Sequence, residues 1–346
     1  MNSTIALFLL QDGVINGAIY ALLGVTLVLV FAVTRVIFVP QGEFMTWGAL
    51  TLASLQSGVT PGTAWLLVVL GLCAAVIEFF RERESMTLAR FGVIALRDIA
   101  IPIALLLLVS SIAPTKPVLW VGVLLTLALV IPLGPLVYRL AFQPIADATV
   151  LTLFIAAIGV HFAMIGLGLV FFGAEGFRTE PFIAGVFPIG GLMFKGQSLV
   201  ILGVTAGLLA ALWFFFEHSM LGKALRATAI NRLGARLVGI PTRATGRIAF
   251  ALAAAIGALS GTLIGSLTTI SYDSGFIISL KGFVAAIAAG LASYPLTVAA
   301  AILVGVLESF SAFFASAYKE VIVFSLIIPL LIWRSLVANH HDDEEE

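Results

Sequence analysis

The sequence predicts an all-α fold, a polytopic bundle of transmembrane helices, and three observations carry that prediction. Its 346 residues are 61% hydrophobic and only 10% charged, whereas a soluble domain carries about 25% charged residues. Long apolar runs recur along the chain and are separated by short polar connections. The 33 glycines favour the close helix packing found in bilayers, where small side chains let backbones approach. Residues 1–337 are therefore expected to form one transmembrane domain.

The apolar runs give the expected helices in order. They cover 5–33, 41–57, 63–80, 99–113, 118–138, 149–172, 198–216, 247–269, 279–292, 296–313 and 320–336. The first run lacks the positively charged leader of a cleavable signal peptide, so it is expected to be retained. A helix needs about 20 residues to cross about 30 Å of hydrocarbon. Runs 99–113 and 279–292 are shorter, which predicts half-helices or tilted pairs and about 9–11 crossings in total.

Basic residues concentrate in two connections and predict the orientation. Residues 217–247 hold six basic residues and one acidic residue, and residues 81–98 hold four arginines. Cytoplasmic connections of membrane proteins carry an excess of Lys and Arg, so both connections are expected in the cytoplasm. Alternating the spans from there places 173–197 outside, the N-terminus outside and the C-terminus inside.

The connection 217–247 contains a basic, helix-prone segment from Gly222 to Ile240. Apolar residues recur at every fourth position along it: Leu225, Ala229, Leu233 and Leu237. That spacing predicts one apolar stripe on a single helix. The basic residues fall largely off the stripe: Lys223, Arg226, Arg232 and Arg236. Such a helix would be a docking site for a soluble partner, and the alternative is a loop that is basic only because cytoplasmic loops usually are.

Ionisable residues inside apolar runs are costly in a bilayer and are candidates for function. Four residues qualify: Glu43, Glu78, Lys281 and Glu308. Glu78 lies close to Arg81 at a span end, where snorkelling to the interface explains it. Lys281 and Glu308 are predicted to form an intramembrane polar pair, either structural or part of an ion path. His161 falls mid-span and is predicted to be a hydrogen-bonded packing residue or the lining of a polar path.

The segment FVPQGEF, residues 38–44, is unusual at the start of a span. Pro40 interrupts a helix and Gly42 allows close backbone approach, while Gln41 and Glu43 offer polar side chains at a depth where water is scarce. Broken helices of this kind often line the path of a transporter. The alternative is an ordinary cytoplasmic turn before the second span.

Composition and motifs exclude several classes of function. Zero net charge, from 18 basic and 18 acidic residues, gives no bulk attraction to nucleic acid. No G-x-x-x-x-G-K-[ST] loop occurs, so any ATP chemistry belongs to another subunit. Cys73 is the only cysteine and the four histidines lack metal-ligand spacing, so no metal site, catalytic residue or cofactor is expected in this chain. The tail 338–346, which ends HHDDEEE, is expected to be a solvated acidic end.

Four segments together resemble a known family: GKALRATAINRLGARLVGI at 222–240, FALAAAIGALSGTL at 250–263, SLKGFVAAIAAGL at 279–291 and VGVLES at 304–309. They are similar to the permease subunits of branched-chain amino-acid (Liv-type) ABC importers, and the similarity covers about 6–56 and 136–336. The resemblance implies a type II-like ABC importer permease in the bacterial inner membrane. Its partners would be a second permease subunit, related or identical, two cytoplasmic ATP-binding subunits that use ATP and Mg, and an external solute-binding protein.

The resemblance also implies roles for particular residues. Segment 222–240 matches the family's cytoplasmic coupling region, and the residues expected to couple to the ATPase are Lys223, Arg226, Asn231, Arg232, Arg236 and Gly239. The substrate path would be bordered by Gln41, Gly42 and Glu43. Where the family usually reads N-F-A-H-G-E-F, however, only Gly42, Glu43 and Phe44 keep the pattern, which leaves the solute open among branched-chain amino acids, amides, urea and small carboxylates.

Two other departures concern packing. Ala292 and Leu296 stand where glycine is commoner in the family, and residues 80–117 look like an insertion carrying one extra helix pair. The function implied is a translocation path for a small amino-acid-like solute, delivered by a binding protein and moved by alternating access. The runner-up is an ion-coupled secondary transporter of a small polar solute, working through Glu43, Lys281 and Glu308. A membrane-embedded enzyme is disfavoured by the missing catalytic clusters.

Overall fold

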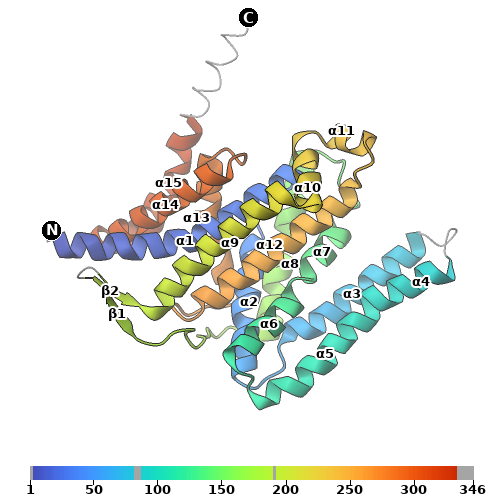
Figure 1. The fold of residues 1–346 in the computed structure, drawn as a ribbon, viewed down its shortest axis with the longest axis horizontal. Coiled ribbons are helices and arrows are strands. Elements are labelled where there is room, and N and C mark those ends of the chain that lie inside the picture. Colours follow the sequence, from blue (N-terminus) through green and yellow to red (C-terminus); the bar gives the residue numbers. More distant parts are fainter. Residues whose placement is uncertain (1–2, 82–86, 190–191, 333–346) are drawn as a thin grey trace, which may run out of the picture.

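The computed structural model describes residues 3–81, 87–189 and 192–332, and it is almost wholly helical (Figure 1). The helices are α1 (Ser3–Thr34), α2 (Gln41–Gln56), α3 (Gly62–Arg81), α4 (Leu88–Ala95), α5 (Ile101–Ile112), α6 (Leu119–Val130), α7 (Leu133–Val137), α8 (Val150–Phe172), α9 (Gly196–His218), α10 (Met220–Ile230), α11 (Arg232–Leu237), α12 (Thr242–Ile264), α13 (Ser274–Ala288), α14 (Tyr294–Phe314) and α15 (Lys319–Ser325). Two π-helical turns, η2 (Leu96–Ala100) and η4 (Tyr138–Phe142), and two 3-10 turns, η3 (Ala113–Thr115) and η5 (Ser316–Tyr318), adjoin them. Strands β1 (Val186–Ile189) and β2 (Leu192–Lys195) pair antiparallel, with Val186 opposite Lys195. The predicted acidic tail, 338–346, lies outside the described residues.

Within the described residues, eight helical segments are long and apolar enough to cross a membrane, which confirms the predicted transmembrane bundle. One expectation about length is wrong. The run 99–113 is no half-helix, because α4, η2, α5 and η3 join into one segment over 91–115 that is 25 residues long. Arg97 and Asp98 lower the hydropathy of its first part, so the apolar run begins only after them. The short run near 279–292 remains short, since α13 has only 15 residues.

Residues 80–117 were expected to carry an extra helix pair, and the structure shows a different arrangement. The segment contributes one long helical stretch, and its partner is α3, which precedes it (Figure 1). The two approach closely at Gly71, where a Cβ would collide with the carbonyl oxygen of Asp98. The hairpin therefore consists of α3 and the α4–α5 segment, and it leans away from the rest of the bundle.

α1 and α2 lie at the centre of the remaining helices. α1 packs chiefly on α14 and α13, and α2 packs on α12. Small residues allow these crossings: a Cβ on Gly305 would collide with the backbone of Gly13, and one on Gly261 would collide with the backbone of Met45. α2 has 16 residues, 14 of them buried, so it is about 24 Å long. It is too short to cross alone and is enclosed by its neighbours.

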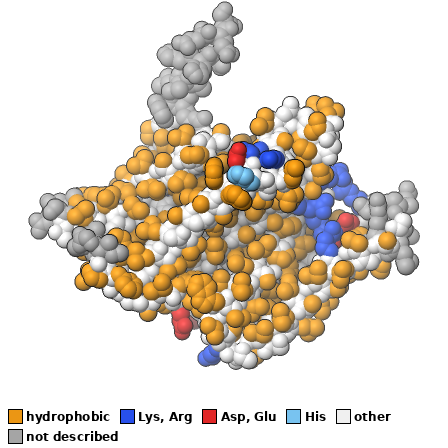
Figure 2. Space-filling model, in the orientation of Figure 1, with side chains coloured by type: hydrophobic (Ala, Val, Ile, Leu, Met, Phe, Trp, Pro, Cys, Tyr) orange, Lys and Arg blue, Asp and Glu red, His pale blue; other side chains and the backbone are white. Residues whose placement is uncertain are grey.

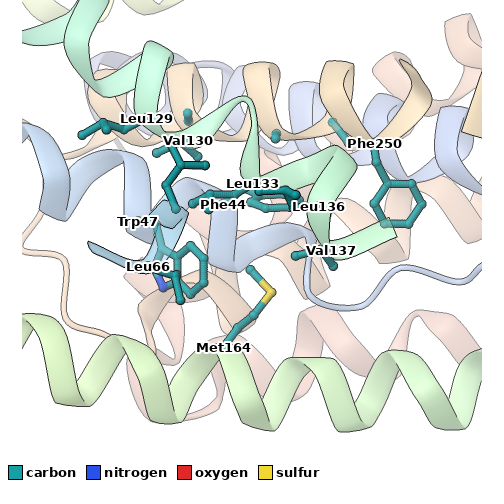
Figure 3. Packing of buried hydrophobic residues seen from close by; sticks show 14 of the residues in the cluster. Phe44, Trp47, Leu66, Leu129, Val130, Leu133, Leu136, Val137, Met164 and Phe250 are labelled. Atoms are coloured by element: carbon teal, nitrogen blue, oxygen red, sulfur yellow. The ribbon is translucent and has the colours of Figure 1, made fainter. Parts of the chain in front are cut away.

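Apolar packing around α2 fixes its position. Phe44 and Trp47 lie among Leu66 of α3, Leu133 of α7 and Met164 of α8 (Figure 3). Between helices in a bilayer the lipid tails are as apolar as the side chains, so the stabilisation comes from dense van der Waals contact more than from removal of water. The start of α2 is therefore held rigidly inside the bundle.

The two ends of the bundle differ in the charged and polar groups they carry. At one end lie basic residues from four connections or helix ends: Arg35, Arg81, Arg139, Arg232, Arg236, Arg243 and Arg247. At the other end, Phe177 forms a β-bridge with Ile270, and Gln11 Nε2 donates to the carbonyl of Met193 at 3.1 Å. The described parts of 217–247 and 81–98 thus share one end and those of 173–197 lie at the opposite end, the arrangement that alternating spans require.

Candidate functional site

The predicted coupling segment, residues 222–240, forms two helices. α10 ends at Ile230 and α11 begins at Arg232, because Asn231 between them has an extended backbone (φ −146°, ψ 100°). Its side chain caps α11 by accepting a hydrogen bond from the amide of Gly234 at 2.8 Å, a role for which Asn is well suited. The expectation of one continuous amphipathic helix is therefore wrong.

The break also divides the expected apolar stripe. Leu225 of α10 is buried in a cluster with residues of α1, α9 and α12. Leu233 and Leu237 of α11 are instead 68% and 80% exposed, and Ile230 at the junction is 86% exposed. α10 is thus the half that is fixed to the bundle. α11 lies at the edge of the molecule (Figure 1) and presents apolar side chains to the surroundings.

Two arginines fasten α11 to the connection between η4 and α8. Arg232 Nη1 donates to the carbonyl of Ala146 at 2.8 Å, and Arg236 Nη2 donates to Oδ1 of Asp147 at 2.9 Å. Arg236 Nε also donates to Oγ1 of Thr242 at 3.0 Å. The hydrogen bond from Arg236, together with the positive charges nearby, holds the pKa of the Asp147 carboxyl below its ordinary value. These arginines therefore position α11 within its own chain.

The other residues predicted for coupling have weaker attachments. Arg226 forms an ion pair with Glu217 at 2.8 Å, but both side chains are more than 40% exposed, and such surface pairs contribute about 0–1 kcal/mol. Lys223 is exposed and takes part in no ion pair formed by the described residues. Gly239 follows α11 with φ +86°, a left-handed conformation that favours glycine.

Gln41, Gly42 and Glu43 form the first turn of α2, and all three are buried. Gln41 Nε2 donates to the carbonyl of Ala253 in α12 at 3.0 Å. Gly42 lies against Gly275 in the first turn of α13, where a Cβ on either residue would collide with the backbone of the other. The segment is therefore neither an exposed turn nor a break within a span. It is the start of a helix enclosed by α12 and α13.

Glu43 lies beside His161 of α8. Nδ1 of His161 is 3.2 Å from Oε1 of Glu43, a distance suited to an ion pair if the imidazole is protonated. The geometry makes no hydrogen bond, so both atoms remain without a partner. The His161 ring packs on Phe276 with 4.4 Å between centroids. His161 is thus a buried packing residue, but its Nδ1 lacks the hydrogen bond that was expected, and it adjoins a buried carboxylate, which the sequence did not indicate.

Several buried polar atoms around this pair lack hydrogen-bond partners among the described residues. They are Oε1 of Gln41, both carboxylate oxygens of Glu43, Oγ1 of Thr46, Nε1 of Trp47 and Nδ1 of His161. Buried polar groups are normally bonded, and intramembrane ionisable groups mark functional sites. This buried polar centre is therefore the strongest candidate for a site where a polar solute is bound within the bundle.

A second buried polar group joins α1, α13 and α14. Lys281 Nζ donates to Oε1 of Glu308 at 2.5 Å, and Tyr20 Oη donates to Oε2 of the same carboxylate at 2.5 Å. Lys281 also lies over the ring of Tyr20, 5.6 Å from its centroid. All three residues are buried, so the carboxylate and the ammonium compensate each other's charge. The structure thus brings Lys281 and Glu308 together and adds Tyr20 to them.

A hollow of about 700 Å³ opens next to Glu308, at the end opposite the coupling segment. Its lining includes residues of α1, β2, α9, α14 and the start of α15, among them Asp12, Asn16, Lys195 and Lys319. Both signs of charge therefore border the hollow. It lies at the end of the bundle where the connection 173–197 lies.

Comparison with known proteins decides the family. A family model described as the permease component of branched-chain amino acid transport systems matches residues 84–331. The chain belongs to this family. The match includes most of residues 80–117, the segment interpreted from the sequence as an insertion.

Individual relatives of the permease agree with that assignment. The permease is 26% identical to the high-affinity branched-chain amino acid transport permease BraD of Pseudomonas aeruginosa, over 82% of its own length and 94% of BraD. It is 29% identical to LivH of Salmonella typhimurium and 28% identical to LivH of Escherichia coli, in each case over 56% of its own length and 65% of LivH. Among solved structures, PsaBC from Streptococcus pneumoniae in complex with Fab aligns with a TM-score of 0.41 and 12% identity, over 93% of this chain and 90% of that chain.

Membership gives the permease its general role. It is a multi-pass membrane transport subunit of an ABC transporter and not an enzyme. It works with ATP-binding and solute-binding partners. The alternative of a lone ion-coupled transporter is not favoured.

Sequence reasoning missed several residues of the permease that contact the predicted ones. Asp147 and Ala146 hold the arginines of α11, and Tyr20 completes the Lys281–Glu308 pair. His161 was singled out, but its contact with Glu43 was not foreseen. The partners lie far apart in the sequence and no spacing rule joins them. Only the isolated polarity of Tyr20 within an apolar run could have drawn attention to one of them.

Proposed function

We propose that this permease forms part of the translocation path for a branched-chain amino acid or a similarly small amino-acid-like solute. The relatives BraD and LivH are named as permeases of high-affinity branched-chain amino acid transport systems. A solute of this kind carries one ammonium and one carboxylate on a small apolar body. The buried polar centre around Glu43 supplies hydrogen-bond donors and acceptors without partners inside an otherwise apolar bundle.

The observation that carries the coupling proposal is the exposed apolar surface of α11. Leu233 and Leu237 stand out at the basic end of the bundle, while α10 and the contacts of Arg232 and Arg236 fix the helix to the membrane part. Apolar side chains surrounded by basic residues suit a protein partner with an apolar pocket and an acidic rim. We propose that this partner is the ATP-binding subunit, and that its movement on ATP binding is passed through α11 to the bundle.

The assembly proposed contains two permease subunits, related or identical, two cytoplasmic ATPases and one external binding protein. The ATPases bind ATP and Mg, and this chain binds neither. Positive residues favour the cytoplasm. The proposal therefore has the basic end with α11, and the C-terminus, on the cytoplasmic side of a bacterial inner membrane. The binding protein then delivers its solute at the opposite end, near the hollow bordered by Asp12 and Lys195.

Within that assembly, Gln41, Gly42 and Glu43 are proposed to border the path at the start of α2. Two features support this: Oε1 of Gln41 and both carboxylate oxygens of Glu43 lack partners among the described residues, and the first turns of α2 and α13 meet beside them. Meeting helix ends with polar groups at membrane depth are typical of transporter sites. Alternating access would open this enclosed centre to each side in turn.

The test is a double variant, Leu233→Glu with Leu237→Glu, expressed with the ATPase subunits. Truncation or charging of central interface residues costs about 1–2 kcal/mol each, or about tenfold in affinity, so co-purification of the ATPase should be lost while the permease still inserts. The matched control is Val118→Glu with Val186→Glu, exposed apolar residues at the opposite end. Unchanged co-purification in the α11 variant, or uptake by the permease alone, would overturn the proposal.

A further inference from the structure

Four charged residues join the hairpin of α3 and α4–α5 to the bundle. Arg97 Nη2 lies 2.6 Å from Oε2 of Glu78, and its Nε and Nη2 donate to Asp98 at 2.9 and 2.7 Å. Arg139 of η4 donates to Asp98 at 2.7 Å and also to Glu78. Each arginine therefore contacts both acids. Two positive and two negative charges cancel, so this charge quartet is neutral.

Beside the charge quartet is a hollow of about 110 Å³ between α3, η4 and α12. Arg81, Arg243 and Arg247 line it together with members of the quartet. Arg243 and Arg247 take part in none of the ion pairs that the described residues form. Because the acids of the quartet are already neutralised, the hollow has an excess of positive charge. Figure 2 shows basic side chains gathered where the hairpin leans away from the bundle.

An unpaired donor points to a missing ligand in the hollow. Nε of Arg247 is buried and has no hydrogen-bond partner among the described residues. An arginine side chain offers several N–H donors in a planar fork that matches the oxygens of a phosphate group. A tetrahedral anion with several acceptor oxygens would satisfy these donors and balance the charge.

The surroundings of the hollow favour a phospholipid over a free phosphate ion as the source of that anion. The adjoining face of α3 is apolar and exposed: Val76, Ile77 and Phe80 are 52%, 51% and 68% exposed, and Ile77 also lines the hollow. A small polar hollow that continues into an apolar helix face matches a phospholipid, whose phosphate is charged and whose chains are apolar. Basic pockets between helices near a membrane surface bind such headgroups.

We infer that the hollow between α3, η4 and α12 binds the phosphate of an anionic phospholipid whose acyl chains lie along the exposed face of α3. The lipid belongs to the inner leaflet, and only this choice of leaflet rests on the orientation proposed above. Bound there, the lipid stabilises the contact between the hairpin and the bundle. Its phosphate gives Arg243 and Arg247 the acidic partner that they do not have among the described residues.

The test compares lipid retention by the full chain. The protein is purified without phosphate, exchanged into nanodiscs of phosphatidylcholine with or without phosphatidylglycerol, and the lipids that stay bound after detergent extraction are counted by native mass spectrometry. Wild type should retain phosphatidylglycerol in preference to phosphatidylcholine. Arg243→Gln and Arg247→Gln should each lower that retention about fivefold, the change expected for about 1 kcal/mol per basic residue. The control, Lys116→Gln with Lys223→Gln, removes two charges away from the hollow and should leave retention unchanged.

Other arms separate the sources of the anion. Inorganic phosphate should not raise the melting temperature of the protein, whereas phosphatidylglycerol should. Equal stabilisation by both would overturn the lipid in favour of a free anion. Equal lipid retention by wild type and the arginine variants would also overturn the proposal, and loss of ATPase co-purification with unchanged lipid would assign the arginines to a protein partner. If Arg247→Gln does not fold, Arg243→Gln at an exposed residue still decides.

Discussion

Gly42 and Gly275 lie backbone against backbone, and a Cβ on either residue would collide with the carbonyl oxygen of the other. Gly42 also approaches Ser279, and Gly275 approaches Thr46, so the first turns of α2 and α13 run antiparallel past each other. Two short helices that cannot cross a membrane alone are thereby joined at their starting points, next to Glu43.

Substitution at this crossing should destabilise the protein. Gly42→Ala or Gly275→Ala adds a methyl group that meets backbone atoms, and overpacking of this kind costs about 1–3 kcal/mol. The yield of monodisperse protein and its melting temperature in detergent should both fall. Gly159→Ala and Gly166→Ala are matched controls in α8, because no atom lies within 4 Å of a Cβ added there. Equal melting temperatures for the Gly42 and Gly275 variants and for the controls would show that the α2–α13 contact has room for a methyl group.

Changing the buried polar centre should lower transport more than assembly. Gln41→Ala removes the donor to Ala253, and Glu43→Gln keeps the shape of the side chain while removing its charge. With a saturating binding protein, uptake into vesicles should drop several-fold at an unchanged amount of assembled complex. Thr51→Ser, further along the buried α2, provides the control. Wild-type uptake in both variants would return the segment to a purely structural role.

The Lys281–Glu308 pair should behave as a structural unit. Removing one partner of a buried ion pair costs about 3–5 kcal/mol, since the other charge is left uncompensated. Lys281→Met and Glu308→Gln should therefore each destabilise strongly, and the double variant should recover much of the loss. Melting temperatures of the four proteins give this coupling directly. Additive losses would argue against the pair, and uptake abolished by a protonophore would favour an ion path through it.

The attachment of α11 should be independent of pH over the neutral range. The hydrogen bond from Arg236, and then the charges of Arg236 and Arg232, lower the pKa of Asp147 in the folded protein. A carboxyl with a lowered pKa contributes fully above its ordinary value and loses its contribution only as the pH falls through the lowered value. Hydrogen exchange of α11, corrected for intrinsic rates, should thus give constant protection from about pH 5 to 8. Asp147→Asn should reduce protection across that range, and a pH-dependent change in wild type would contradict the assignment.

Thiol labelling should report the orientation. After Cys73→Ser, a cysteine at Leu237 should react with an impermeant reagent only in inside-out vesicles, and one at Ala174 only in right-side-out vesicles. Both positions are exposed in the structure. Ala174 is preferable to Gly176, because a Cβ at Gly176 would lie 2.5 Å from the side chain of Thr269. The reverse labelling pattern would invert the bundle and remove the basis for placing the ATPase at α11.

Composition and apolar runs were sufficient to predict the class of fold, because a bilayer requires long apolar helices. They failed where charges were compensated at a distance. Arg97 and Asp98 made the run at 99–113 look short, but Glu78 and Arg139 neutralise them and the helix continues through 91–115. A window of hydropathy counts each charge as isolated, so it cannot detect such compensation.

The candidate site was predicted in part for similar reasons. Periodicity located the coupling segment, but it treated residues 222–240 as one helix and missed the break at Asn231. The signal was present, since Asn is a strong helix N-cap, although an apolar repeat of four outweighed it. The approach of His161 to Glu43 could not be predicted, because it depends on how α8 packs against α2.

The neutral charge quartet has a consequence for the order in which the protein is made. Chains are synthesised from the N-terminus, so Glu78, Arg97 and Asp98 enter the membrane machinery before Arg139 exists. Until then the two acids of the quartet share a single arginine, Arg97. Arg139 follows in the next long helix and completes the balance. We therefore expect the hairpin to reach its final attachment to the bundle only after the helix that carries Arg139 has been made.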